Sequence, residues 1–112
     1  IPLERISATS SGMTSIMISL QCLVEPSDNV VVVSPIWPNV VIAIESIAAT
    51  VRFVPLQADD GVWSLDLDAV EAACDKRTRA IFLASPSNPT GWTYPQSSSV
   101  NFSTWRAGRE RG

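Results

Sequence analysis

The sequence contains no histidine, and Lys76 is its only lysine. Catalytic triads and metal sites that rely on an imidazole ring are therefore excluded. Cysteine is also scarce: only Cys22 and Cys74 are present, and their wide separation matches neither a metal-ligand spacing nor a dense disulfide framework. We therefore expect two reduced thiols, a cytoplasmic location and no metal site.

Charge and long apolar runs are scarce as well. Charged residues make up 17% of the 112 residues, and the net charge of −3 gives no sign of the clustered cations that a nucleic acid needs. No apolar stretch approaches the roughly 20 residues of a membrane helix, and the start, with Glu4 and Arg5, lacks the apolar segment of a signal peptide. We expect neither a nucleic-acid partner nor a membrane partner. The 46% of hydrophobic residues suffices for the core of one domain, or of part of one.

These apolar residues alternate between strand-like and helix-like patterns. Strands are predicted over residues 5–9, 30–33, 51–54 and 79–84. The second of these is an unbroken run of valines, which is typical of a strand buried on both faces. Helices are predicted over about residues 16–23, 37–49 and 65–76, with Asp66 or Asp68 as the cap of the third, and residues 59–61 fall in a polar loop. The alternation predicts an α/β fold with a mainly parallel sheet and right-handed crossovers.

Three loops, at residues 10–14, 34–39 and 85–91, are predicted to begin where strands end, which is where such folds place ligands. In the first, Ser11, Gly12 and Met13 open a helix, so free backbone N–H groups and the positive end of the helix dipole suit a phosphate. An ordinary strand-to-helix turn with capping serines fits the same residues equally well.

The other two loops each carry one side chain of interest. Trp37 lies between two prolines, so its ring is held stiffly and fits stacking on a flat heteroaromatic ligand, although packing over the end of the sheet is the alternative. Asn88 lies between prolines that restrict the backbone on both sides, so its amide is well placed to donate a hydrogen bond to a phenolate or carboxylate oxygen. A purely structural Asx-turn competes with that interpretation.

The segment Ser-Pro-Ser-Asn-Pro-Thr-Gly-Trp at residues 85–92 resembles the loop of class I/II aminotransferases, which are fold type I pyridoxal-phosphate (PLP) enzymes. The other two loops match in order and spacing, and the resemblance runs from about residue 5 to 94. It implies that residues 1–95 are part of the large, cofactor-binding domain. By the same resemblance Ser11, Gly12 and Met13 hold the PLP phosphate, Trp37 stacks on the pyridine ring, and Asn88 donates to its phenolic oxygen. It also predicts a cis peptide before Pro35, before Pro89, or before both.

The resemblance implies a transaminase that moves an amino group between an amino acid and a 2-oxo acid, and that forms a homodimer at full length. Its Schiff-base lysine, its aspartate and its substrate-binding arginine are all expected beyond Gly91, so we assign no catalytic residue to this chain and expect it to be truncated and inactive alone. Lys76 falls where the family has a surface position. The alternatives are a fragment of a PLP-dependent lyase or of an aminotransferase-like regulator domain, or a non-catalytic remnant that binds a partner subunit.

Residues 96–112 depart from the family, because a serine run and an Arg/Gly-rich end replace the expected helix rich in Glu and Leu. One set of codons for residues 100–107, read one nucleotide out of step, encodes Glu-Leu-Leu-Asp-Leu-Ala-Arg. We therefore hypothesise that a frameshift produced this irregular tail. The coding DNA tests this hypothesis directly.

Overall fold

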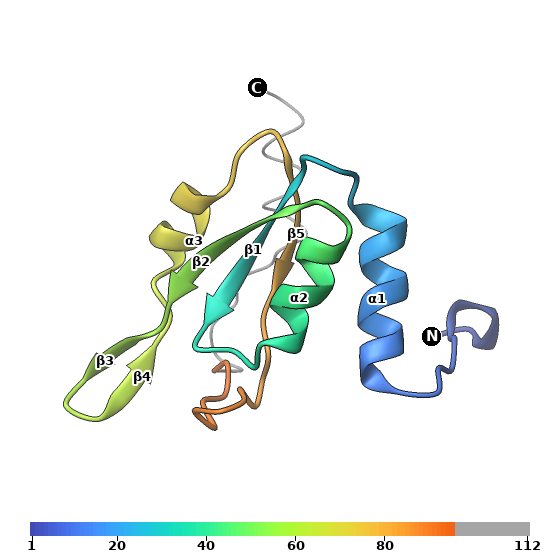
Figure 1. Cartoon of the computed structure of the whole chain (residues 1–112). Coiled ribbons are helices and arrows are strands. Elements are labelled where there is room, and N and C mark those ends of the chain that lie inside the picture. The colour runs from blue at the N-terminus through green and yellow to red at the C-terminus, as the bar shows by residue number, and fades with distance from the viewer. Residues whose placement is uncertain (96–112) are drawn as a thin grey trace.

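The computed structural model describes residues 1–95, which form a parallel sheet covered by helices on both faces (Figure 1). The sheet has the strand order β2-β1-β5, formed by Thr50–Pro55, Asn29–Ser34 and Thr78–Phe82. The helices α1 (Gly12–Leu23) and α2 (Asn39–Ser46) pack on one face, and α3 (Leu67–Ala73) packs on the other. The predicted α/β fold is confirmed.

The central strand β1 owes its place to its four valines. Val30 and Val32 point toward α1 and α2, whereas Val31 points toward α3, because successive side chains of a strand alternate between faces. These three valines are fully buried. Only a strand with neighbours on both edges and helices on both faces buries such a run completely, and β1 pairs in parallel with both β2 and β5.

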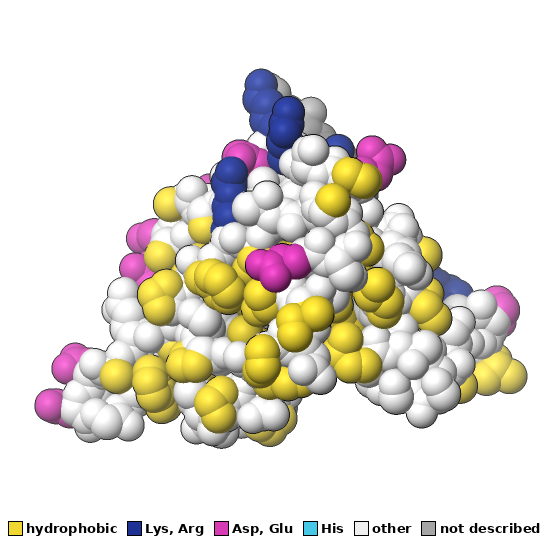
Figure 2. All heavy atoms as spheres, viewed as in Figure 1, with side chains coloured by type: hydrophobic (Ala, Val, Ile, Leu, Met, Phe, Trp, Pro, Cys, Tyr) yellow, Lys and Arg dark blue, Asp and Glu magenta, His cyan; other side chains and the backbone are white. Residues whose placement is uncertain are grey.

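The helices follow the amphipathic pattern that burial on one side requires. In α2, Val40, Ala43 and Ile44 are buried, and their spacing of three and four residues puts them on one side. Ile42 lies on the other side and is 61% exposed. The face that carries α2 shows many apolar side chains and few charged ones (Figure 2).

One local prediction was wrong and another was incomplete. Residues 5–9 form no strand: a short 3-10 turn at Leu3–Arg5 is followed by exposed chain, which pairs with no strand among residues 1–95. The loop predicted at residues 59–61 is the end of a hairpin, β3 (Gln57–Asp59) and β4 (Val62–Ser64). Asp60 and Gly61 both have positive φ angles, of 45° and 79°, as a two-residue type I′ hairpin turn requires. The predicted tail and its frameshift lie outside the described residues and stay a hypothesis.

A polar network holds the amino-terminal edge of the sheet together. The Asp75 carboxylate accepts hydrogen bonds from the Asn29 side chain (2.9 Å) and the Arg77 backbone N–H (2.7 Å), and it pairs with the Arg52 guanidinium. Asn29 begins β1 and Arg52 lies in β2, while Asp75 lies three residues before the start of β5. One carboxylate therefore connects all three strands where they begin.

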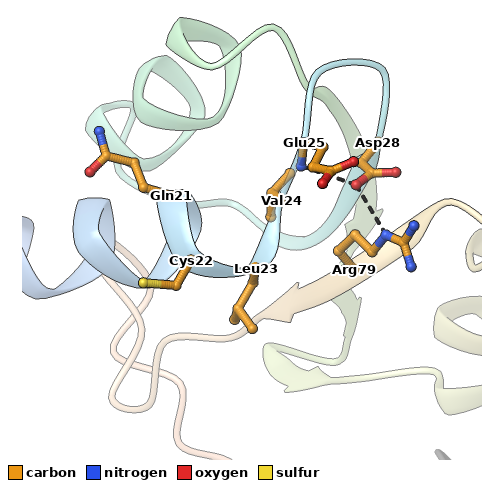
Figure 3. Close-up of a pocket in the computed structure, with 7 residues that line it drawn as sticks. All are labelled: Gln21, Cys22, Leu23, Val24, Glu25, Asp28 and Arg79. Carbon is orange, nitrogen blue, oxygen red and sulfur yellow. Dashed lines mark hydrogen bonds and ion pairs between the residues drawn. The ribbon is translucent and has the colours of Figure 1, made fainter.

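These contacts lower the pKa of Asp75 from 3.8 to about 2. The Asn29 hydrogen bond is the largest cause, followed by the Arg77 N–H and, more weakly, by Arg52. Next to this network, Asp28 pairs with Arg79 at 3.0 Å, beside a shallow hollow lined by residues 21–25 (Figure 3).

Candidate cofactor-binding site

The three loops singled out in the sequence lie at the carboxyl-terminal edge of the sheet. Strands β1 and β5 end there, and α1, which runs antiparallel to them, begins there (Figure 1). One detail of the prediction was wrong, because the first loop follows exposed chain rather than a strand. All three loops lie at this edge nonetheless, since α1 runs back along the sheet and so begins at the end where the strands finish.

The first loop contains backbone N–H groups that are not used in hydrogen bonds within the described chain. The Ser11 hydroxyl caps α1 by accepting the Thr14 N–H at 3.1 Å. The Gly12 and Met13 N–H groups, however, have no protein acceptor within residues 1–95, as expected for the first turn of a helix. A Cβ built on Gly12 would meet nothing within 4 Å, so packing in the chain itself does not require glycine there. The space over these two amides is open to an anion.

Three hydroxyl groups lie close together on the same turn. Thr14 Oγ1 lies 2.9 Å from Ser11 Oγ and 3.2 Å from Ser10 Oγ. Each of these hydroxyl groups can rotate to donate to an incoming oxygen. The turn is therefore capped as an ordinary helix start, and it also retains the donors that a phosphate uses.

Trp37 takes up the packing that was the alternative to ligand stacking, and its stacking on a ligand stays a prediction. It is half-buried, and its buried part packs against the core cluster beneath α1 and α2. Met13 packs against the same cluster, so the first and second loops share one support. The residue as a whole stays partly accessible to solvent.

Asn88 stands at the exposed tip of the third loop. Within the described chain its side-chain amide has no hydrogen-bond partner, so no Asx-turn occupies it. The loop is tied to the second one, because the Ser87 hydroxyl donates to the Pro35 carbonyl at 3.5 Å. The predicted cis peptides before Pro35 and Pro89 are both present, and a third precedes Pro86.

Two buried residues of this third segment were not singled out from the sequence. Ser87 and Trp92 are buried, whereas Asn88 between them is exposed. No local pattern marks them, because their burial depends on strands that are distant in sequence. The position of Trp92 directly after the Pro-Thr-Gly turn was the one available signal.

Among residues 1–95, neither a lysine nor a metal-binding cluster is found near these loops. Lys76 is exposed in the turn before β5, at the opposite edge of the sheet, as its predicted surface position requires. The hollow in Figure 3 also lies at that opposite edge. Among residues 1–95, no three side chains of His, Cys, Asp or Glu gather as a metal site would need, and none of the helices is long and apolar enough to cross a membrane.

This geometry agrees with what comparison with known proteins shows. Residues 4–102 match the family described as aminotransferase class I and II, so the chain belongs to that family. The matched region contains all three loops, and the resemblance first recognised at residues 85–92 is therefore confirmed.

Individual relatives give the same result. The histidinol-phosphate aminotransferase of Methanococcoides burtonii is 33% identical over 105 residues, which are 93% of this chain and 28% of that protein. The N-succinyldiaminopimelate aminotransferase of Mycobacterium tuberculosis superposes with a TM-score of 0.76 at 31% identity, covering 80% of this chain and 23% of that one.

The fold also matches that of cystalysin from Treponema denticola, a structure that contains pyridoxal 5′-phosphate. The TM-score is 0.81 at 22% identity, and the match covers 87% of this chain and 25% of that one. Across the curated relatives it matches, the chain spans about a quarter of their length.

Proposed function

We propose that this chain forms the PLP-binding edge of an aminotransferase that transfers an amino group between an amino acid and a 2-oxo acid. The observation that carries the proposal is the position of three loops at one edge of a parallel sheet, with the Gly12 and Met13 amides lacking a protein acceptor within residues 1–95. In α/β sheets this edge is where ligands bind. Membership of the aminotransferase family supports the assignment.

The residues present fit the cofactor group by group. Ser11, Gly12 and Met13 would hold the phosphate with the first backbone amides of α1 and with a hydroxyl. The accessible part of Trp37 would cover the pyridine ring. The free amide of Asn88 would donate to the phenolic oxygen and would lie near a substrate carboxylate. When bound, PLP supplies the electron sink for amino-group transfer.

In this proposal the edge binds PLP and orients it. The described residues place no lysine there, because Lys76 lies at the far edge. We therefore propose that the chain alone binds PLP without completing the transfer. At full length we propose a cytoplasmic homodimer that acts on amino acids and 2-oxo acids.

The substitution Gly12→Ala tests the phosphate contact separately from folding. A methyl group at this position has free space in the protein, and alanine is favoured over glycine in helices by roughly 0.5–1 kcal/mol, so the variant should fold at least as well. The same methyl group would occupy the space over the two amides, and the affinity for PLP should fall about tenfold or more, or about 1.4 kcal/mol. Titration followed by PLP absorbance measures this affinity, and thermal unfolding measures stability.

The matched control is Ser19→Ala, at an exposed position further along α1, and it should leave PLP affinity unchanged. Equal PLP affinity of Gly12→Ala and the wild type would contradict the phosphate contact. A wild-type chain that binds no PLP but forms concentration-dependent oligomers in sedimentation would favour the non-catalytic interaction module instead. That outcome has a physical basis, since Ile42 and Phe53 are 61% and 54% exposed.

A further inference from the structure

The segment from Ser85 to Tyr94 is a closed loop whose two ends are joined. The Tyr94 N–H donates to the Ser85 hydroxyl at 2.9 Å, and the Ser87 N–H donates to the Trp92 carbonyl at 2.7 Å. Inside the loop, the Gly91 N–H donates to the Ser87 carbonyl at 2.7 Å. These bonds leave Asn88 at the tip with little independent backbone freedom. Its position is set by whatever holds the base of the loop.

The base is held by the indole of Trp92. This residue is 8% exposed and packs with Val33 and Leu56 in an apolar cluster. It also meets the Tyr94 ring edge to face, with the ring centroids 6.0 Å apart at an interplanar angle of 87°. Val33 lies near the end of β1 and Leu56 directly follows β2, so the indole rests on the carboxyl ends of two strands.

Trp92 therefore connects the rigid sheet to the exposed amide by a short path. Its side chain is fixed on the strand ends, and its carbonyl takes the N–H of Ser87, the residue next to Asn88. Ser87 in turn contacts the Pro35 carbonyl of the second loop. A shift of the indole would move the loop tip as a unit, whereas a shift of an exposed tryptophan such as Trp63 would not.

From this geometry we infer that Trp92 is a positioning residue, which sets the place of Asn88 over the sheet edge by acting through Ser87. The inference rests on the proposed function, because it assigns Trp92 a role in cofactor binding. A displacement of about 1 Å in a binding group is enough to weaken its contribution strongly. Phenylalanine in place of Trp92 keeps an apolar ring but leaves the cluster partly unfilled, so the loop base should shift.

The test is a double-mutant cycle on PLP affinity that combines Trp92→Phe with Asn88→Ala. If Trp92 acts through Asn88, each single variant should lower PLP affinity by about tenfold. The double variant should then be little worse than either single one, because the two changes remove the same contact. The control Trp63→Phe, on the β3–β4 hairpin, should leave the affinity unchanged. Losses that multiply in the double variant would overturn the inference, since Trp92 would then act on folding or on another contact.

A second measurement decides the question without any cofactor. In the ¹⁵N-labelled chain, the side-chain NH₂ signals of Asn88 should shift in Trp92→Phe and stay in place in Trp63→Phe. If Trp92→Phe does not fold, Val33→Ala takes its place, because it removes part of the apolar contact under the Trp92 indole without altering the loop. It should shift the same Asn88 signals. Unmoved Asn88 signals in the folded variants would overturn the positioning role. Failure of the wild-type chain to bind PLP would count against the proposed function alone.

Discussion

The substitution Ile44→Ala is expected to remove much of the stability of this chain, whereas Ile42→Ala, two residues away on the same helix, is expected to remove little. Ile44 is fully buried in the cluster with Val30 and Val32, and Ile42 is 61% exposed. Truncating a buried isoleucine to alanine costs about 2–5 kcal/mol, because apolar burial is lost and a cavity remains. With all of its side chain buried, Ile44 should lie in the middle of that range, at about 3–4 kcal/mol.

Comparing Ile44→Ala with Ile42→Ala separates the effect of lost burial on the free energy of unfolding from the effect of helix propensity. Both variants exchange isoleucine for alanine inside α2, so both gain the same few tenths of a kcal/mol of propensity. The cost at Ile42 should stay within about 0.5 kcal/mol, as is usual for exposed positions. Urea unfolding followed by circular dichroism measures both free energies of unfolding, with equal slopes as the check on two-state behaviour. If Ile44→Ala is too unstable to fold, Ile44→Val should still cost about 1 kcal/mol. Equal costs at the two positions would refute the packing of α2 on the sheet described above.

Two further predictions concern polar contacts. The lowered pKa of Asp75 means that its stabilising effect is complete above its ordinary value of 3.8 and is lost as the pH falls toward about 2. Asp75→Asn should therefore lose less of its resistance to urea than the wild type does between about pH 5 and pH 2. Parallel pH curves for the two proteins would contradict the network at the amino-terminal edge. The Asp66 carboxylate accepts the N–H groups of Asp68 and Ala69 at the start of α3, so Asp66→Ala should cost about 1 kcal/mol in thermal or urea unfolding, and Asp68→Ala, which removes no cap, should cost clearly less.

The main elements of the fold could be predicted from local pattern, because buried segments have a recognisable arrangement of hydrophobic residues. The valine run of β1 indicated a strand covered on both faces, and the structure confirms it. Asp66, one of two candidates, is confirmed as the cap of α3. The hairpin turn at Asp60 and Gly61 was missed, although Asp-Gly is a recognised hairpin signal, because the polar residues around it were interpreted as a plain loop. The strand predicted at residues 5–9 was wrong for a different reason. Extended chain becomes a strand only when a partner strand lies beside it, and the sequence of one segment does not show whether such a partner exists.

The position of the three candidate loops was predictable to a similar degree. Gly12, Trp37 and Asn88 stood out because small, aromatic and amide residues occur at places where strands and helices meet. Trp92 did not stand out, because its importance comes from contact with the ends of β1 and β2, which lie more than thirty residues earlier in the chain. Packing between distant segments leaves no periodic trace in the sequence, so residues that support a site are harder to find than residues that line it.

The Asp75 network and the three loops lie at opposite ends of the same strands, and this separation affects which substitutions the protein can accept during evolution. The strands are held together at one end, where the Asp75 carboxylate contacts Asn29, Arg77 and Arg52. Substitutions at the other end can then accumulate and alter ligand preference while the sheet stays aligned. A library randomised at the loops should accordingly yield many folded members, whereas one randomised around Asp75 should yield few.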